Sequence, residues 1–430
     1  MNKRQKTRFI IKIILIILLI IFAVERIYNM KDEFRVSALD ASDYGITETH
    51  LPIWDKLYDF EYLYDVLEEN YPFFKVNERL HNIDWLGNKR KYKRIIRNTK
   101  NDAEFLVAID HILKDLNNGH VNVFDGQRYR RYFKNAYLYN SKFGDPWGSL
   151  RKIEILSNHH IMGRYNFFGD MDEIEHIKLY DDSALETKVL IDNELAYMEI
   201  KEMAEFDTAI NDQIKIKDFL REISDYDKLI IDIRGNRGGY DSYWNYIVSL
   251  LIKEPISYNY YSFFKGDYRH SYNPYRISYL SKINKLEEGI LDQFPEEVKT
   301  DFNFYRNYTV RINPWLTATN SSDYINFKGK VYLLVDNLVF SASENFASFA
   351  KDSGFATLVG ETTGGDRVFE VIPFISLPKS RFVIRYSREL GINADGTINM
   401  ETGTIPHIQV DPTPHEDFTK DQCIQAVIND

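Results

Sequence analysis

The sequence predicts an α/β fold of the mixed α+β kind, preceded by an N-terminal transmembrane helix and a helical cap domain. Three observations lead to this prediction. An apolar run lies near the N-terminus, helical spacing dominates up to about residue 125, and short β-branched runs alternate with helical segments after residue 190. Strands that alternate with helices favour a sheet with crossover connections.

The N-terminal segment is predicted to hold the protein in a membrane. The run 9–24 is apolar apart from Lys12 and follows a basic flank at residues 3–8. A helix that is apolar on every face does not suit a water-exposed surface, and Lys12 can reach the lipid headgroups. The basic flank should stay in the cytoplasm. We therefore expect residues 1–30 to form the flank and anchor, and the chain beyond them to lie outside the cell.

A stalk is expected over residues 31–55, which are polar and irregular. The alternative to an uncleaved single-pass anchor is a secreted protein with a cleaved signal peptide. Val36-Ser37-Ala38 is a small-residue cleavage site for that case, although it lies far from the end of the apolar run.

Two further regions precede the expected sheet. Residues 56–125 carry apolar side chains at helical spacing, as at Phe105, Ile109 and Ile112, and predict a helical N-terminal domain. Residues 126–190 are expected to connect this domain to the sheet.

A core domain is predicted over residues 191–415, followed by a C-terminal helix at 416–430. Helical spacing recurs in two of its segments, and residues 255–325 carry many Tyr and Phe residues and read as an insertion. The predicted strands are short runs rich in β-branched and aromatic residues, at 195–200, 228–233, 330–335, 356–360 and 381–386.

Composition excludes several functional classes. The net charge of −10 argues against a nucleic-acid partner, because phosphate binders are usually basic. Cys423 is the only cysteine, so the chain can form neither an internal disulfide nor a cysteine-rich zinc site.

Ser341 is the first candidate for chemistry. It follows a buried-strand pattern at 330–335 and a short turn, and begins a helical pattern. A serine at such a junction has an exposed hydroxyl, and the helix N-terminus favours negative charge beside it. The alternative is purely structural, because Ser341 and Glu344 have the spacing of a capping box.

Two other segments could complete a site. Asp232-Ile233-Arg234-Gly235-Asn236-Arg237-Gly238-Gly239 follows a buried strand, and its glycines allow close backbone approach to a ligand. It lacks the spacing of nucleotide-binding loops, so backbone N–H donors for an oxyanion are the better use. His120 follows a helix end and Gly119, where it is either a polar loop residue or a catalytic base.

Together these segments resemble the C-terminal processing, or tail-specific, serine peptidase family. Residues 228–239 look like the family's strand with D-x-R-x-N-x-G-G, and 341–344 like its S-A-S-E turn. Residues 358–365 look like its G-x-x-T-x-G loop, and 116–123 like its histidine segment, with Asn118 in place of the usual acid. The resemblance covers roughly residues 55–415 and implies a mixed-sheet peptidase core of the tail-specific protease type.

One departure concerns the base. Family members of the Ser–Lys type carry a lysine just after the glycine loop, where this chain has Asp366 and then Arg367. Neither side chain can replace a neutral lysine, since arginine stays protonated. The chain therefore resembles the tricorn-core-like and nisin-resistance-protein-like branch without that lysine, in which a histidine serves as base. His120 stands at that histidine's place, and Glu401 is our candidate for the third catalytic residue.

The resemblance also implies the remaining site residues. The N–H groups of Gly238 and Ala342 would hold the oxyanion, and Gly239, Gly364 and Gly365 would line the substrate. No PDZ module is expected, and no cofactor or metal is implied.

The resulting hypothesis is a membrane-anchored, extracellular serine-type endopeptidase, a hydrolase that acts on peptides or protein tails through an acyl-enzyme. The main alternative is an inactive peptidase-like protein that binds peptides, and an esterase is a third. The sequence specifies neither the substrate sequence nor an oligomeric state.

Overall fold

The computed structural model describes most of the chain from residue 39 onward. The described residues are 39–430 apart from 144–148, 180, 182, 267–283, 286–293, 315–323 and 370–371. The predicted anchor at 1–30 therefore lies outside the described residues. No helix within the described part of the chain is long and apolar enough to cross a membrane.

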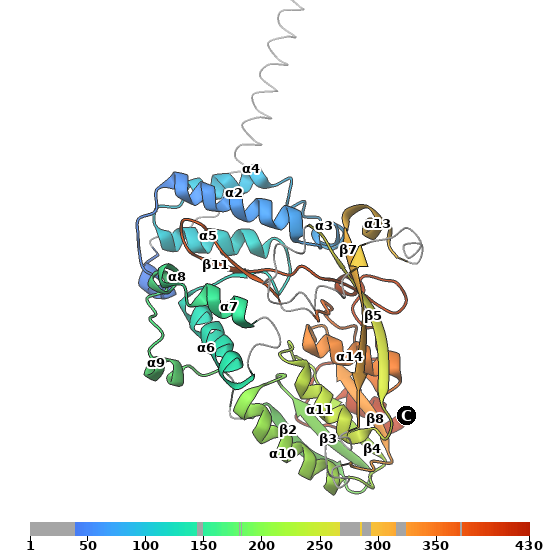
Figure 1. The fold of residues 1–430 in the computed structure, drawn as a ribbon. Coiled ribbons are helices and arrows are strands. Elements are labelled where there is room, and N and C mark those ends of the chain that lie inside the picture. The colour runs from blue at the N-terminus through green and yellow to red at the C-terminus, as the bar shows by residue number, and fades with distance from the viewer. Residues whose placement is uncertain are drawn as a thin grey trace, which may run out of the picture.

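A group of helices forms the N-terminal part of the molecule, at the top and left of Figure 1. Their aromatic and aliphatic faces share one hydrophobic core with side chains from far along the chain, including Phe263 and Phe374. The helical region is thus packed onto the rest of the protein and does not have a core of its own. Its elements are η1 (Ala41–Tyr44), α2 (Ile53–Asn70), α3 (Phe74–His81), α4 (Lys89–Arg97), α5 (Asp102–Lys114), α6 (Gly126–Phe143), α7 (Ser149–Leu156), α8 (His159–Arg164) and α9 (Met171–His176).

A six-stranded sheet forms the core at the other end. Its order is β13-β9-β8-β4-β3-β2, and all neighbours are parallel except the antiparallel pair β2 and β3. Its strands are β2 (Leu185–Ile191), β3 (Leu195–Ile200), β4 (Lys228–Asp232), β8 (Lys330–Val335), β9 (Thr357–Gly360) and β13 (Ile408–Gln409).

Helices cover both faces of this sheet, which explains the continuous apolar runs of its central strands. On one face, Leu229 and Ile231 pack with α10 (Phe206–Glu222), α11 (Asp241–Leu251) and α14 (Ala342–Ser353). On the other face, Ile230 packs with α16 (Gln422–Asn429).

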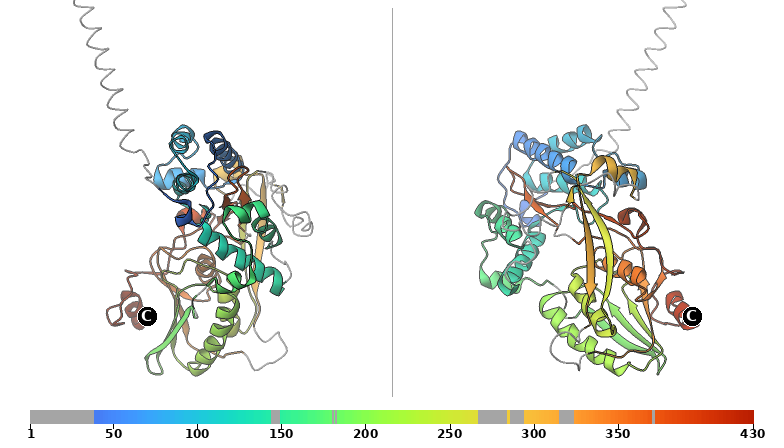
Figure 2. Two further views of the ribbon diagram at one scale, coloured as in Figure 1. Left: turned by 90° about the vertical axis from the view of Figure 1, so that its left-hand side faces the viewer. Right: turned by 45° about the vertical axis from the view of Figure 1, so that its right-hand side comes forward.

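A long antiparallel hairpin links the two ends of the molecule. β5 (Ile256–Phe264) and β7 (Phe304–Ile312) pair along their whole length and run from the sheet up to α13 (Glu296–Asp301), as the right-hand view of Figure 2 shows. Two short strands, β6 (Asn284–Lys285) and β12 (Leu390–Ile392), extend this second sheet. The described part of the predicted insertion at 255–325 is thus largely this hairpin.

A third, small sheet joins the N-terminal region to the C-terminal half. β1 (Asn122–Val123) pairs with β11 (Val383–Arg385), which pairs with β10 (Phe374–Ser376). A short helix, α15 (Asn399–Thr402), follows β12. This pairing brings the segment after α5 to the loops of the core.

The predicted mixed α/β fold is confirmed, and two boundaries are wrong. The sheet begins at β2 and not at residue 191, because the edge strand β2 has no buried side chain and gives a weak apolar pattern. The predicted stalk at 31–55 is packed from residue 39 on: Ile46 is buried, and Asp102 accepts hydrogen bonds from the N–H groups of Thr49 and Leu51.

Candidate active site

Ser341 stands at a strained turn between β8 and α14. Its backbone has φ 61° and ψ −122°, a conformation that costs free energy for a residue with a side chain. Its side chain makes no capping hydrogen bond to the helix. Glu344 accepts instead from Asn399 and from the Thr404 hydroxyl, both at 2.6 Å. The capping-box alternative for Ser341 is therefore wrong, and the turn leaves the Ser341 hydroxyl available to other groups.

His120 lies directly beside this hydroxyl. Its Nε2 is 2.9 Å from Ser341 Oγ, although the two residues are 221 positions apart in the chain. The Asn118 side chain accepts a hydrogen bond from the His120 backbone N–H at 2.7 Å. The imidazole ring also packs on Phe340, with 4.5 Å between ring centroids. The turn after α5 thus fixes the position of the ring.

Asp366 occupies the other side of the ring. Its Oδ2 is 2.7 Å from His120 Nδ1, and both side chains are almost completely buried. Asp366 has φ 57°, in the left-handed region that aspartate adopts more readily than most residues. A carboxylate at Nδ1 keeps the proton on that nitrogen, so Nε2 accepts from the Ser341 hydroxyl. Asp366 occupies the position at which related Ser–Lys peptidases carry a lysine, and here it completes a Ser–His–Asp arrangement.

Glu401 lies elsewhere. Its carboxylate accepts two hydrogen bonds from Arg79, which also binds Glu297, so the three residues form a partly exposed cluster between α3, α13 and α15. The structure does not bring Glu401 to His120, and Asp366 holds the place predicted for it.

Burial is the main influence on the charge of His120. It lowers the pKa of the imidazole, and the positive charge of Arg385 lowers it further, while Asp366 opposes both. The lowered pKa favours the neutral form of the ring near pH 7. A neutral imidazole is the form that can take a proton from serine.

The backbone groups around Ser341 differ in part from the prediction. The Gly238 N–H is donated to Asn236 Oδ1 at 2.9 Å, so it is not available as the predicted oxyanion donor. Ala342 is the first residue of α14, where helix N–H groups have no partner within the helix. The groups on either side of Gly239 bond Met203, so the Gly239 N–H points away from Met203.

The glycines near the turn have visible packing roles. A Cβ atom on Gly238 would lie 2.7 Å from the Phe340 carbonyl oxygen and 2.8 Å from the Ala342 nitrogen. The Gly364 N–H is donated to the Val339 carbonyl at 2.8 Å, and a Cβ atom on Gly365 would lie 2.5 Å from the Asn399 carbonyl oxygen. These glycines allow the loops to pack closely around the turn at Ser341.

Two buried asparagines link the pieces of the site. Asn399 donates to Glu344 on α14 at 2.6 Å and accepts from the Arg367 N–H at 2.8 Å, beside Asp366. Asn236 accepts from the Ser343 hydroxyl at 2.6 Å as well as from Gly238. Sequence reasoning missed Asp366 and Asn399 as site residues, since no local pattern marks them.

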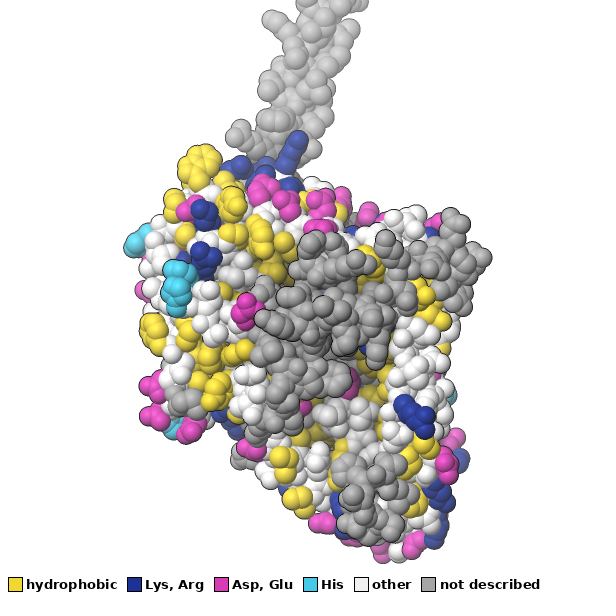
Figure 3. Space-filling model, in the orientation of Figure 1, with side chains coloured by type: hydrophobic (Ala, Val, Ile, Leu, Met, Phe, Trp, Pro, Cys, Tyr) yellow, Lys and Arg dark blue, Asp and Glu magenta, His cyan; other side chains and the backbone are white. Residues whose placement is uncertain are grey.

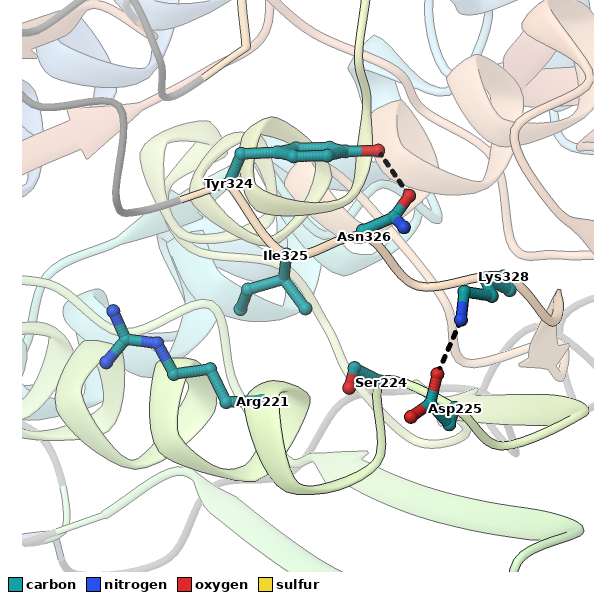
Figure 4. Close-up of a pocket in the computed structure, with 7 residues that line it drawn as sticks. All are labelled: Arg221, Ser224, Asp225, Tyr324, Ile325, Asn326 and Lys328. Carbon is teal, nitrogen blue, oxygen red and sulfur yellow. Dashed lines mark hydrogen bonds and ion pairs between the residues drawn. The ribbon is translucent and has the colours of Figure 1, made fainter.

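A separate pocket of about 220 Å³ lies at the C-terminal end of α10 (Figure 4). Its lining contains none of Ser341, His120 and Asp366, and it includes an exposed ion pair between Lys328 and Asp225. Within the described ranges, no group of three or more His, Cys, Asp or Glu side chains could hold a metal ion. The pocket is lined by Arg221, Ser224, Asp225, Tyr324, Ile325, Asn326 and Lys328.

Comparison with known sequences identifies the core. The sequence model of Peptidase family S41 matches residues 194–410, half of the chain. The chain belongs to this family. The S41 match contains Ser341 and Asp366, whereas His120 comes from the region before it. No curated protein matches the chain.

Solved structures are similar in fold over most of the chain. A putative peptidase from Parabacteroides merdae is 18% identical, with a TM-score of 0.52, and the match covers 87% of this chain and 96% of that one. A mutant of CPAF is 12% identical with a TM-score of 0.53, covering 88% and 98%, and mature CPAF is 12% identical with a TM-score of 0.50, covering 83% and 92%. At these identities the likeness speaks for the fold, including the helical region ahead of the S41 core.

Proposed function

We propose that the protein is a serine-type endopeptidase in which Ser341 is the nucleophile, His120 the base and Asp366 the residue that orients His120. The single observation that supports this proposal best is the continuous contact from Ser341 Oγ to Nε2 and from Nδ1 to Asp366, at 2.9 and 2.7 Å. A nucleophile, a base and a residue that orients the base are the parts that acyl transfer requires.

The proposed reaction proceeds in two halves. His120 takes the proton from Ser341 as Oγ attacks the peptide carbonyl, and Asp366 stabilises the imidazolium that forms. The imidazolium then gives its proton to the leaving amine, which departs and leaves an acyl-enzyme. Water, activated by His120 in the same way, releases the new carboxyl end and restores Ser341.

The N–H groups of Ala342 and Gly239 are the proposed oxyanion donors. Ala342 begins α14 beside the nucleophile, and Gly239 follows the glycine that packs on Ser341. One such donor typically lowers the barrier by about 3 kcal/mol. This pair replaces Gly238 in the role predicted from the sequence.

We further propose that the chain is anchored in the cell membrane by residues 1–30, with the peptidase outside, so that extracytoplasmic peptides or protein tails are its substrates. The outer face of the helical region supports this placement. Arg90, Arg94 and Arg97 of α4 are exposed, and Figure 3 shows basic side chains gathered over this helix at the top of the molecule. Such a face suits a position close to anionic headgroups. Secretion after signal cleavage remains the alternative.

A fluorophosphonate probe tests the proposed serine chemistry. We expect the purified full-length chain to label, and Ser341→Ala and His120→Ala to lose labelling. Ser343→Ala is the matched control, because that hydroxyl bonds Asn236 and not His120, and it should still label. Labelling that survives in His120→Ala would refute the Ser–His mechanism, and a folded wild-type protein that never labels would favour the inactive peptide-binding alternative. A panel of matched peptide and ester substrates separates a peptidase from an esterase.

A further inference from the structure

Two cationic side chains lie together near His120 and pack against neighbouring aromatic rings. Lys152 on α7 and Arg385 on β11 are both partly buried. Among the residues that the structure describes, neither forms an ion pair or a side-chain hydrogen bond. Their contacts are aromatic: Lys152 Nζ lies 4.9 Å from the centre of the Phe374 ring, and Arg385 Cζ lies 5.7 Å from the centre of the Tyr132 ring.

The small sheet places this pair beside the catalytic histidine. Arg385 is directly opposite Asn122 on one side and Phe374 on the other, so these three side chains share a face of the sheet. Asn122 follows His120 by two residues, and the positive charge of Arg385 lowers the pKa of the His120 imidazole. The rings of Tyr132 and Phe374 pack edge to face with 5.3 Å between their centroids, so both cations lie against one continuous aromatic surface.

Two like charges in such surroundings are costly unless an anion joins them. Cation–π contacts with Phe374 and Tyr132 offset part of that cost but leave the hydrogen-bond donors of both groups available. A planar guanidinium next to an ammonium matches a carboxylate, which can accept from both at once. The two donor groups together therefore suit a carboxylate ligand.

We propose that Lys152 and Arg385 form a subsite that binds a carboxylate of the substrate on the His120 side of Ser341. This inference rests on the proposed peptidase function and adds a substrate class to it: peptides with an acidic side chain or a free C-terminal carboxylate near the scissile bond. The shared chemistry is the carboxylate, and the experiment below separates its two sources.

The lowered pKa of Lys152 is also in line with an anion-binding site. Burial lowers the pKa of its ammonium to about 7, and Arg385 contributes to the lowering. A bound carboxylate would favour the charged form of Lys152 and would offset the effect of Arg385 on His120. Binding of the right substrate would thereby make His120 a better base.

The test uses the full-length protein and four fluorescein-labelled hexapeptide pools, randomised in the same way. The pools carry either Glu or Gln at one fixed position and end in either a carboxylate or an amide. We expect at least one carboxylate-bearing pool to exceed its amide counterpart by about tenfold or more in kcat/KM, which is the scale of a hydrogen-bonded charge. The pool that shows the difference identifies the source of the carboxylate.

Variants then assign the preference to the two cations. Lys152→Gln and Arg385→Gln should each reduce the preference, and the double variant should abolish it while cleavage of the doubly neutral pool persists. Arg94→Gln is the control, since Arg94 is an exposed cation on α4, and it should keep the full preference. Equal rates on acid and amide pools in the wild type, or a preference that survives in the double variant, would overturn the proposal.

The subsite proposal and the peptidase proposal can be refuted independently of each other. Fluorophosphonate labelling reports the activated serine without a carboxylate, so a wild type that labels but ignores acidic groups would refute only the subsite. Fluorescence polarisation of the same pools on Ser341→Ala measures binding without hydrolysis. Tighter binding of acidic pools, lost in the double Lys152→Gln and Arg385→Gln background, would support the subsite even in a protein that never labels.

Discussion

The helical region, which ends with α9 at His176, and the core at 194–410 contribute to the candidate site in different ways. The core supplies Ser341 and Asp366 on loops that leave neighbouring parallel strands, and it is the part that the S41 sequence model matches. The helical region supplies His120, which reaches the core because β1 pairs with β11. One strand, one turn and one helix position Ser341, and together they leave a compact motif in the sequence. His120 reaches Ser341 through long-range strand pairing, which leaves only a histidine after a glycine in the sequence.

The largest expected effect separates the two acids that could have supported His120. Asp366→Asn should lower kcat by about 10⁴-fold, because an amide no longer stabilises the imidazolium or the required tautomer. Glu401→Gln should change kcat by less than about twofold, since Glu401 pairs with Arg79. Steady-state kinetics on a common peptide pool would measure both. Comparable losses in the two variants would contradict the assignment of Asp366.

This contrast shows which structural elements and site residues the sequence could predict. The strands at 228–233 and 330–335 were predictable because helices bury both faces and demand an unbroken apolar run. Asp366 was visible only as a missing lysine, since its partner lies 246 residues away and no local pattern encodes such a contact. Gly238 was misassigned because the Asn236 side chain competes for its N–H, which a motif does not reveal. Asn399 was missed for the same reason as Asp366.

The second prediction concerns stability within the core. Arg234 is buried and forms ion pairs with Asp232 at 2.6 Å and Asp421 at 2.9 Å. Arg234→Met should lower the free energy of unfolding by about 3–5 kcal/mol, because two buried carboxylates lose their cation. Urea unfolding of the full-length protein in detergent would measure the change.

Lys201→Met is the matched control for Arg234, since its pair with Glu186 is exposed. It should cost less than about 1 kcal/mol. Similar losses for Lys201 and Arg234 would mean that the buried network does not stabilise the core more than an exposed pair does.

The third prediction tests how the helical region positions its histidine. Asn118→Ala removes the acceptor of the His120 N–H, and should lower kcat by about tenfold with little change in KM. Asn118→Asp keeps an acceptor at the same place and should restore most of the rate. A loss in KM alone, or an equal loss in both variants, would argue against this positioning role.

The smallest expected effect is a shift in pH dependence. The base must be neutral to act, and burial lowers the pKa of His120, so labelling by a fluorophosphonate should decline only as pH falls below 6.5. Arg385→Gln removes a charge that lowers this pKa, and should move the acidic limb to higher pH. A wild-type midpoint above 6.5 would contradict the described environment of His120.

The pairing of β1 with β11 also determines at what stage of protein synthesis the candidate catalytic group can form. Synthesis runs from the N-terminus, so the histidine is made more than two hundred residues before the serine and about 265 residues before its supporting strand ends at Arg385. A growing chain can therefore hold a folded helical region and still lack a complete catalytic group. Because of this order, an incomplete chain lacks the Ser341–His120–Asp366 group. The group can form only after almost the whole chain has been synthesised.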